Sequence, residues 1–318
     1  MSKILVTGGA GFIGSHTIKS LIEQGHDVVS VDDFNDYYSP QLKQDRIEKF
    51  LKDYDFPSFD LDIRNLEELK KLFKAYKFDK VCHLAARAGV RASLEDPFVY
   101  QSTNIQGTLN LLELSKDYGV NNFVYASSSS VYGNTKETPF REDMSVDRPI
   151  SPYAATKKTC ELLAHNYSHI YGLPTIGLRF FTVYGPWGRP DMAYFSFANK
   201  IKKGESIDVY NYGKDLKRDF TYVDDIVKGI VACLDKEYKY EIFNLGNNKP
   251  VELMEFINSL EKHLGIESKK NLLPMQPGDV MITYANIDKA KRFLGYEPTI
   301  SIDAGLKNFV NWYKEYYV

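Results

Sequence analysis

Tyr153 and Lys157 stand four residues apart in the segment SPYAATKK (151–158), inside a stretch that predicts a long helix. Residues spaced i and i+4 share one helix face, so the phenol and the ammonium would lie side by side. A neighbouring positive charge favours the phenolate form of a tyrosine, which can take a proton from a hydroxyl group. The spacing is common and also fits a solvated helix surface, so it predicts acid–base catalysis only beside a ligand site.

A run of hydroxyl side chains, ASSSSVYG (126–133), follows the apolar segment NNFVYA, which predicts a buried strand. Serine is disfavoured in strands, so four serines at a strand end need an explanation. They indicate either a polar exit into a loop or a ligand-binding strand end.

A glycine-rich turn, TGGAGFIG (7–14), lies between the first predicted strand and the first predicted helix. Gly8, Gly11 and Gly14 allow the backbone to approach a pyrophosphate closely. The helix N-terminus, which includes Phe12 and Ile13, offers backbone N–H groups and a partial positive charge. This context predicts a dinucleotide-binding turn.

An acidic residue, Asp32, ends the second predicted strand. A carboxylate there can accept hydrogen bonds from both hydroxyls of an adenosine ribose and would repel a 2′-phosphate. Asp33 adds a second negative charge, and no compensating arginine follows it. The sequence therefore predicts NAD, rather than NADP, as the cofactor.

The glycine turn, Asp32, the serine run and the pair of Tyr153 and Lys157 lie far apart in the chain. An alternation of strands and helices would bring them together at one edge of a sheet. Apolar runs predict strands, and longer amphipathic segments predict helices, one with Asn65 as its N-cap. This alternation indicates an α/β fold, a doubly wound parallel sheet of the Rossmann type. The expected strands are 3–8, 27–33, 56–63, 79–86, 121–128 and 174–185, and the expected helices are 14–25, 40–54, 65–77, 97–118 and 152–172.

The regular alternation fades after residue 180, which indicates a second, smaller α/β lobe for the substrate. We expect residues 1–178 to form the NAD-binding domain, with segments near 219–246 returning to it. Residues 179–318 would form most of the substrate lobe. No linker, repeat or low-complexity segment separates the two, so the second lobe is expected to grow out of the first.

The composition excludes several classes of protein. Forty basic and 42 acidic residues give a net charge of −2, which does not favour binding to nucleic acid or to an anionic membrane. Cys82, Cys160 and Cys233 are too few and too far apart for a disulfide scaffold or a zinc site. No signal peptide and no apolar run of 18 residues is present, so we expect a cytoplasmic protein without a metal.

The chain resembles the extended short-chain dehydrogenase/reductase family over essentially its whole length. Within that family it is most similar to the nucleotide-sugar 4-epimerases, and among these to the UDP-glucuronate 4-epimerases. The resemblance is carried by TGGAGFIG, DDFNDYY, FDLDIRN, HLAARAGVRAS, STNIQGTLNLLE, ASSSSVYG, SPYAATKK, LRFFTVYGPWGRPDMA, RDFTYVDD and MQPGDV.

The resemblance implies roles for individual residues. Tyr153 and Lys157 match the catalytic pair, and Ser128 matches the catalytic serine or threonine. The implied cofactor contacts are Asp62 and Ile63 at the adenine, Leu84, Ala85 and Ala86 at the diphosphate, and Asn104 near the nicotinamide. The implied substrate contacts are Thr182 at the sugar, Tyr210 at the uracil, Arg218 at the diphosphate and Asp279 at the uridine ribose. Many 4-epimerases carry arginine before PGD, where this chain has Gln276, so Arg218 would have less help.

The serine run also favours one member of the family. Related dehydratases and decarboxylases carry acidic residues at this strand end, where this chain has Ser129 and Ser130. We therefore expect C4 epimerisation without elimination or loss of CO2. Ser129, Ser130 and Thr182 would hold a sugar carboxylate by hydroxyl groups, and Arg189 in GPWGRPD would pair with it through a two-pronged contact. Arg189 also fits an exposed loop.

The predicted activity is an isomerase reaction that converts UDP-glucuronate to UDP-galacturonate through a 4-keto intermediate, with NAD regenerated in each turnover. Two alternatives remain. UDP-glucose/UDP-galactose 4-epimerase would not need Arg189, and an inactive NAD-binding regulatory protein would not need the set of Ser128, Tyr153 and Lys157. The resemblance also implies a homodimer in which helices 97–118 and 152–172 form a four-helix bundle.

Overall fold

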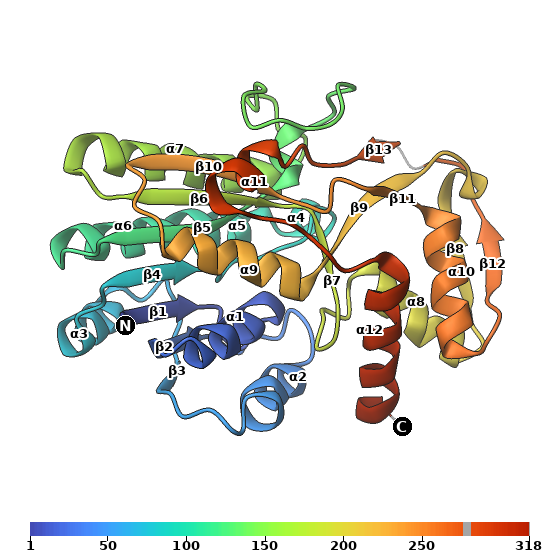
Figure 1. The fold of residues 1–318 in the computed structure, drawn as a ribbon, viewed down its shortest axis with the longest axis horizontal. Helices are drawn as coiled ribbons and strands as arrows, with labels where there is room; N and C mark the ends of the chain where they lie inside the picture. Colours follow the sequence, from blue (N-terminus) through green and yellow to red (C-terminus); the bar gives the residue numbers. More distant parts are fainter. Residues whose placement is uncertain (276–280, 318) are drawn as a thin grey trace.

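A computed structural model describes residues 1–275 and 281–317 of the chain. A seven-stranded parallel sheet forms the centre of the protein (Figure 1). Its strand order is β10-β6-β5-β4-β1-β2-β3, and every neighbouring pair is parallel. The doubly wound fold predicted from the sequence is confirmed. The strands are β10 (Tyr240–Leu245), β6 (Thr175–Phe180), β5 (Asn122–Ser128), β4 (Lys80–His83), β1 (Lys3–Thr7), β2 (Asp27–Asp32) and β3 (Ser58–Asp60).

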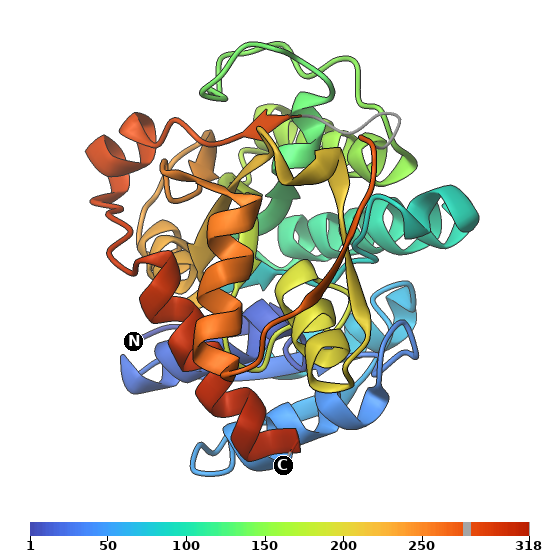
Figure 2. The ribbon, with the colours of Figure 1, turned by 90° about the vertical axis from the view of Figure 1, so that its right-hand side faces the viewer.

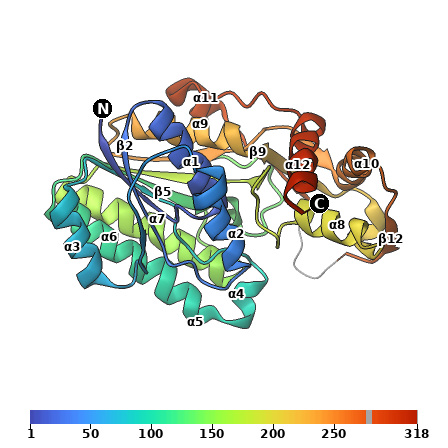
Figure 3. The same cartoon turned by 90° about the horizontal axis from the view of Figure 1, so that it is seen from below.

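Helices cover both faces of this sheet, which explains why its strands are apolar on both sides. In β1, Ile4 and Val6 pack with one set of helices, and Leu5 packs with the other. Figure 3 shows α1 and α9 on one face and α3, α6 and α7 on the opposite face. These helices are α1 (Phe12–Glu23), α9 (Val223–Leu234), α3 (Leu66–Tyr76), α6 (Gly107–Asp117) and α7 (Pro152–Tyr171). Across 1–275 and 281–317, every helix is too short or too polar to cross a lipid bilayer.

A smaller lobe lies beside the carboxyl ends of the sheet and contains α8, α10 and α12 (Figure 2). It holds a sheet in which β9 pairs with β7, β11 and β13, and a separate pair formed by β8 and β12. The chain returns from β9 through α9 to β10, the edge strand of the main sheet. The elements are β7 (Thr182–Tyr184), α8 (Ala193–Lys202), β8 (Ser206–Val209), β9 (Lys217–Tyr222), β11 (Pro250–Glu252), α10 (Leu253–Leu264), β12 (Lys269–Leu272), β13 (Ile282–Thr283) and α12 (Ile302–Tyr317).

Several elements differ from the sequence prediction because tertiary contacts change the local geometry. The expected helix 40–54 is α2 (Pro40–Asp45) followed by a π-helical turn, Arg46–Phe50. The expected helix 97–118 is α5 (Pro97–Tyr100), a π-helical turn at Gln101–Gln106, and α6. The expected strand 174–185 divides between the two sheets as β6 and β7. The short helices α4 (Ala92–Glu95) and α11 (Asp288–Leu294) were not predicted.

Helix α7 carries Tyr153 and Lys157, and its ends are well defined. The side chain of Ser151 accepts a hydrogen bond from the backbone N–H of Ala154 at 3.1 Å, and Pro152 occupies the first turn. Gly172 ends the helix in the left-handed conformation, with φ at 71°. This is the N-cap, proline and C-cap glycine pattern that fixes both ends of a helix.

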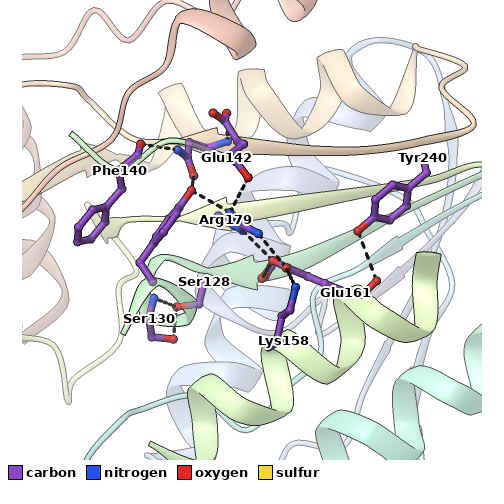
Figure 4. A network of polar contacts seen from close by, with 11 residues as sticks. Ser128, Ser130, Phe140, Glu142, Lys158, Glu161, Arg179 and Tyr240 are labelled. Carbon is purple, nitrogen blue, oxygen red and sulfur yellow. Dashed lines mark hydrogen bonds and ion pairs between the residues drawn. The ribbon is translucent and has the colours of Figure 1, made fainter. Parts of the chain in front are cut away.

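A buried ion pair joins α7 to the sheet (Figure 4). Glu161 accepts two hydrogen bonds from Arg179 of β6, at 2.9 and 3.0 Å, and one from the hydroxyl of Ser127 of β5, at 2.7 Å. Both charged side chains are at least 96% buried. Burial opposes the charge of Arg179, but the contact with Glu161 outweighs it, so the pKa of Arg179 is raised overall. The ion pair therefore sets the position of α7 relative to the strand that ends in Ser128.

The same network reaches the edge strand of the sheet. Arg179 also donates a hydrogen bond to the hydroxyl of Tyr132 at 3.0 Å, and Tyr132 donates to Asn244 of β10 at 2.7 Å. Asn244 in turn donates to the backbone carbonyl of Phe140 at 2.9 Å. The network thus links β5, β6, α7 and β10, which all border the strand end that carries the serines (Figure 4).

We predict that Glu161→Gln destabilises the protein by about 3 kcal/mol or more, because it leaves the buried guanidinium of Arg179 without a counter-charge. The midpoint of urea unfolding of the NAD-saturated protein measures this loss. A double variant, Glu161→Leu with Arg179→Met, should recover much of it, since no buried charge then remains.

The control is Lys116→Ala, which removes a partly exposed ammonium that pairs with Glu113 at 2.9 Å and with Asp117 at 3.3 Å. Such surface pairs contribute at most about 1 kcal/mol. Equal losses in Glu161→Gln and Lys116→Ala would show that the buried pair does not stabilise the position of α7.

Candidate functional site

A single cavity of about 1090 Å³ runs along the carboxyl ends of the sheet and into the small lobe. Ligands of doubly wound sheets bind at this edge. The cavity brings together most of the residues predicted from the sequence. It is lined by Gly8, Gly11, Phe12, Ile13, Gly14, Asp32, Ile63, Leu84, Ala85, Ala86, Ser128, Ser129, Ser130, Tyr153, Lys157, Thr182, Arg189, Tyr210 and Arg218.

The glycine turn forms a close-packed cradle at the start of α1. Gly8 has φ at 72°, and a Cβ there would lie 2.8 Å from the backbone nitrogen of Ala85. A Cβ on Gly14 would lie 2.0 Å from the carbonyl oxygen of Gly8. The first turn of α1 holds no acidic side chain and has no side-chain cap, so its backbone N–H groups are available to an anion. These features fit the pyrophosphate of a dinucleotide.

Asp32 lies at the end of β2 beside this cradle and is 8% exposed. Its carboxylate accepts backbone hydrogen bonds from Ala10 at 3.1 Å and from Phe34 at 3.0 Å, which fix its orientation. Burial raises the pKa of Asp32, and the nearby ammonium of Lys43 acts in the opposite direction. Each carboxylate oxygen keeps a lone pair for a ribose hydroxyl, so the residue fits the adenosine end of NAD.

Tyr153, Lys157 and Ser128 all face the same cavity. Lys157 is 5% exposed, and its ammonium donates a hydrogen bond to the backbone carbonyl of Ala126 at 2.8 Å. This bond ties the lysine to the strand that carries Ser128. The ring of Tyr153 meets Tyr100 edge to face, with centroids 6.1 Å apart. The cavity thus contains a phenol, an ammonium and a hydroxyl group, and their catalytic roles stay predictions.

The four serines divide between two roles. Ser127 also borders the cavity, but its side chain is buried and its hydroxyl donates to Glu161, so it belongs to the structural network. Ser128 to Ser130 line the cavity. The hydroxyl oxygen of Ser128 accepts hydrogen bonds from the backbone N–H of Ser130 at 3.2 Å and from its hydroxyl at 2.9 Å. Ser128 can therefore donate its own proton to a ligand.

Arg189 lines the cavity rather than an open loop surface, and its side chain is 21% exposed. Its Nε donates to Asp191 at 3.1 Å and its Nη2 donates at 2.5 Å. Burial lowers the pKa of Arg189, but the Asp191 carboxylate raises it by more. The guanidinium is therefore a fixed positive charge in the cavity.

Two predicted cofactor residues are engaged within the protein. The amide of Asn104 is 1% exposed, accepts from the backbone N–H of Arg87 at 2.8 Å, and donates to the carbonyl of Arg87 and the hydroxyl of Thr156. Asn104 thus fixes the loop after β4 to α7. Asp62 accepts hydrogen bonds from the backbone and side chain of Arg64. Their contacts with the cofactor stay predictions.

The predicted nucleotide contacts lie at the far end of the cavity. The guanidinium of Arg91 lies 5.8 Å from the centroid of the Tyr210 ring. Arg218 donates a hydrogen bond to the carbonyl of Met281 at 3.0 Å. Asp279 and Gln276 lie outside the described residues, so their predicted roles stay predictions.

The sequence reasoning missed several cavity residues on loops. Tyr37 donates to Asp191 at 3.5 Å, and Arg87 stacks over the Tyr37 ring at 5.2 Å and donates to Asn35 at 2.7 Å. Lys43 faces Asp32. The sequence does contain a signal for the buried network of Arg179 and Glu161. Arg179 stands in the otherwise apolar strand TIGLRF, and a buried charge requires a partner of opposite charge.

Comparison with known proteins shows the family to which the chain is similar. The profile of the NAD dependent epimerase/dehydratase family matches residues 4–246. A UDP-glucuronate 4-epimerase of Thermodesulfobacterium geofontis is 49% identical, covering 99% of this chain and 97% of its own. UDP-glucuronate 4-epimerase 4 of Arabidopsis thaliana is also 49% identical, covering 99% of this chain and 76% of its own. The crystal structure of UDP-glucuronic acid 4-epimerase from Bacillus cereus with UDP-glucuronic acid and NAD is 38% identical. It covers 99% of this chain and 100% of its own, with a TM-score of 0.92.

We predict that Gly14→Ala lowers the amount of NAD bound to the purified protein at least tenfold. The new methyl group would overlap the carbonyl oxygen of Gly8 and push α1 away from the turn that holds the pyrophosphate. Absorbance of the cofactor released on denaturation, together with calorimetric titration with NAD, measures the effect.

Gly119→Ala is the control. Unlike Gly14, Gly119 has a positive φ, which strains an added side chain, but its new methyl group would contact nothing within 4 Å. This variant should lose some stability and keep its NAD. Full NAD content in Gly14→Ala would contradict the assignment of the turn.

Proposed function

The chain belongs to the NAD-dependent epimerase/dehydratase family, and we propose that it interconverts UDP-glucuronate and UDP-galacturonate by epimerisation at C4. The observation that carries this proposal is a cavity that combines Tyr153 and Lys157 with a strand end free of acidic residues and with the guanidinium of Arg189. The identities of 49% with two UDP-glucuronate 4-epimerases support the choice of substrate.

The side chains divide the work of proton transfer. Ser128 donates a hydrogen bond to the 4-hydroxyl, and the phenolate of Tyr153 takes its proton. Lys157 places a positive charge in the same cavity and would donate to the nicotinamide ribose. Bound NAD accepts a hydride from C4 and returns it to the opposite face of the 4-keto sugar. Tyr153 then returns the proton, so the protein and its cofactor end each turnover unchanged.

The carboxylate of the sugar makes the 4-keto intermediate a β-keto acid. Such an acid loses CO2 when its C5–C6 bond aligns with the π-system of the C4 carbonyl. Ser129 and Thr182 would hold the carboxylate by neutral hydroxyl groups, as would Ser130 once its proton turns from Ser128 to the ligand, and Arg189 would pair with it by charge-assisted hydrogen bonds. The end of β5 has no acidic residue that could protonate the sugar carboxylate.

The nucleotide end and the assembly are also part of the proposal. Tyr210 would stack on the uracil, and Arg218 and Asp279 would bind the diphosphate and the uridine ribose.

We propose a cytoplasmic homodimer built on α7 and on residues 97–118. Exposed apolar side chains on α7, Leu162 and Ile170, both 57% exposed, support an interface there.

We predict that Tyr153→Phe lowers turnover of UDP-glucuronate at least a hundredfold and leaves substrate affinity nearly unchanged. The variant keeps the ring and its packing and loses only the group that moves the proton, and positioned acid–base groups supply about 10²–10⁴-fold. NMR spectra of the sugar nucleotides give the rate, and calorimetry gives the affinity. More than a tenth of wild-type turnover would rule out Tyr153 as the base.

Parallel incubation of the wild-type protein with UDP-glucuronate and with UDP-glucose tests the substrate directly. Epimerisation of UDP-glucuronate without accumulation of NADH is expected. Faster turnover of UDP-glucose would favour the alternative epimerase, stoichiometric NADH would indicate a dehydrogenase, and no turnover of either sugar would favour the binding protein.

We predict that Arg189→Ala lowers activity on UDP-glucuronate about ten- to a hundredfold, which corresponds to loss of one charge-assisted hydrogen bond of about 1.5–3 kcal/mol. Any activity on UDP-glucose should change little, because its C6 hydroxyl has no charge to pair. Rates on both sugars in wild type and variant check this. Equal losses would assign Arg189 to the fold or to the diphosphate.

A further inference from the structure

The ion pair between Arg189 and Asp191 lies inside the cavity that would take the sugar, since both residues line it. A guanidinium group is planar and offers two edges that can each bind a carboxylate through two N–H groups. Asp191 occupies the edge formed by Nε and Nη2. Among the described residues, no hydrogen bond to Nη1 of Arg189 occurs, so the second edge, Nη1 and Nη2, is available to a substrate carboxylate.

The guanidinium is also held from its face. Its carbon lies 5.7 Å from the centroid of the Tyr37 ring, and the Tyr37 hydroxyl donates to Asp191 at 3.5 Å. Pro190 lies between Arg189 and Asp191 and restricts the backbone that joins them. Asp191 and Tyr37 together therefore fix the plane of the guanidinium group.

This plane matters for the chemistry of the proposed function, on which the inference rests. In the 4-keto intermediate, loss of CO2 breaks the C5–C6 bond, and its electron pair becomes the C4–C5 enolate. A proton from water then adds to C5 and gives UDP-4-keto-pentose, while the hydride taken from C4 stays on the cofactor as NADH, which NAD added to the assay replaces. The bond can break only when it stands parallel to the carbonyl π-system, so the direction in which the carboxylate is held decides between epimerisation and decarboxylation.

We propose that Asp191 is a positioning residue: it binds one edge of Arg189 and thereby orients the other edge, which holds the C6 carboxylate of the substrate away from the alignment that releases CO2. Asp191 itself does not touch the reacting atoms. Its negative charge also lies near the substrate carboxylate, so it contributes orientation at the expense of some electrostatic attraction.

The two effects predict different kinetic changes in Asp191→Asn. Loss of the ion pair loosens the guanidinium plane, and the ratio of UDP-4-keto-pentose to UDP-galacturonate should rise about ten- to a hundredfold, as small misplacements at reacting groups do. The KM for UDP-glucuronate should stay unchanged or fall, because a repelling carboxylate has gone. Asp191→Glu restores the charge and should bring the product ratio part of the way back.

The experiment follows both products by NMR over time in NAD-loaded wild type, Asp191→Asn, Asp191→Glu and Tyr37→Phe. Tyr37→Phe removes the hydroxyl that contacts Asp191 and Tyr100 and leaves the ring over Arg189, so it should shift the ratio in the same direction by less. It also keeps the test valid if Asp191→Asn does not fold. Asp235→Asn removes an acidic residue that pairs with Lys80 at 3.3 Å outside the cavity, and should keep the wild-type ratio.

A wild-type product ratio in both Asp191→Asn and Tyr37→Phe, with or without a loss of rate, would overturn the positioning role and leave the proposed function intact. A wild-type protein that does not convert UDP-glucuronate would overturn the proposed function, and this inference with it.

Discussion

The buried ion pair between Glu161 and Arg179 is the interaction on which the geometry of the site depends. It is made where α7 crosses β5 and β6, and it includes the hydroxyl of Ser127 directly before Ser128. Two buried charges must satisfy each other in a definite arrangement, because an unpaired charge at this depth is strongly destabilising. Tyr153 and Lys157 lie on the turns of α7 that precede Glu161. The pair therefore sets their position along the helix axis relative to Ser128 at the end of β5.

The chemistry at the other end of the cavity follows from charge placement. The strand end offers hydroxyl groups, which hydrogen-bond to a carboxylate without protonating it, and the positive charge comes from the loop after β7 through Arg189. The cofactor half is built differently. Its contacts come from backbone N–H groups of a glycine turn and from one oriented carboxylate, Asp32, so it depends on a close approach of backbone and ligand.

Most of the site residues predicted from the sequence line the cavity, but the sequence missed lining residues whose partners are distant in the chain. The helix expected at 97–118 contains a π-helical turn, within which Asn104 bonds to Arg87 and Thr156; periodicity does not reveal a change of helical pitch caused by such contacts. The strand expected at 174–185 divides between two sheets because Phe180 ends its pairing with β5 and Thr182 begins pairing with β9. Tyr37 and Arg87 lie on loops, where no regular spacing predicts which side chains meet.

The amino-acid sequence by itself determined the local pieces: the glycine turn that opens α1, the acidic end of β2, and the i, i+4 spacing of Tyr153 and Lys157. Each is fixed by backbone geometry within a few residues, so its residue types are readable from the chain. Only the tertiary structure decided that the hydroxyl of Ser127 donates to Glu161 while that of Ser128 can reach a ligand in the cavity. Only the tertiary structure, too, paired Arg189 with Asp191 inside the same cavity. Those outcomes depend on which buried charges and hydroxyls find partners across the sheet, and such long-range pairing is set by packing rather than by spacing along the chain.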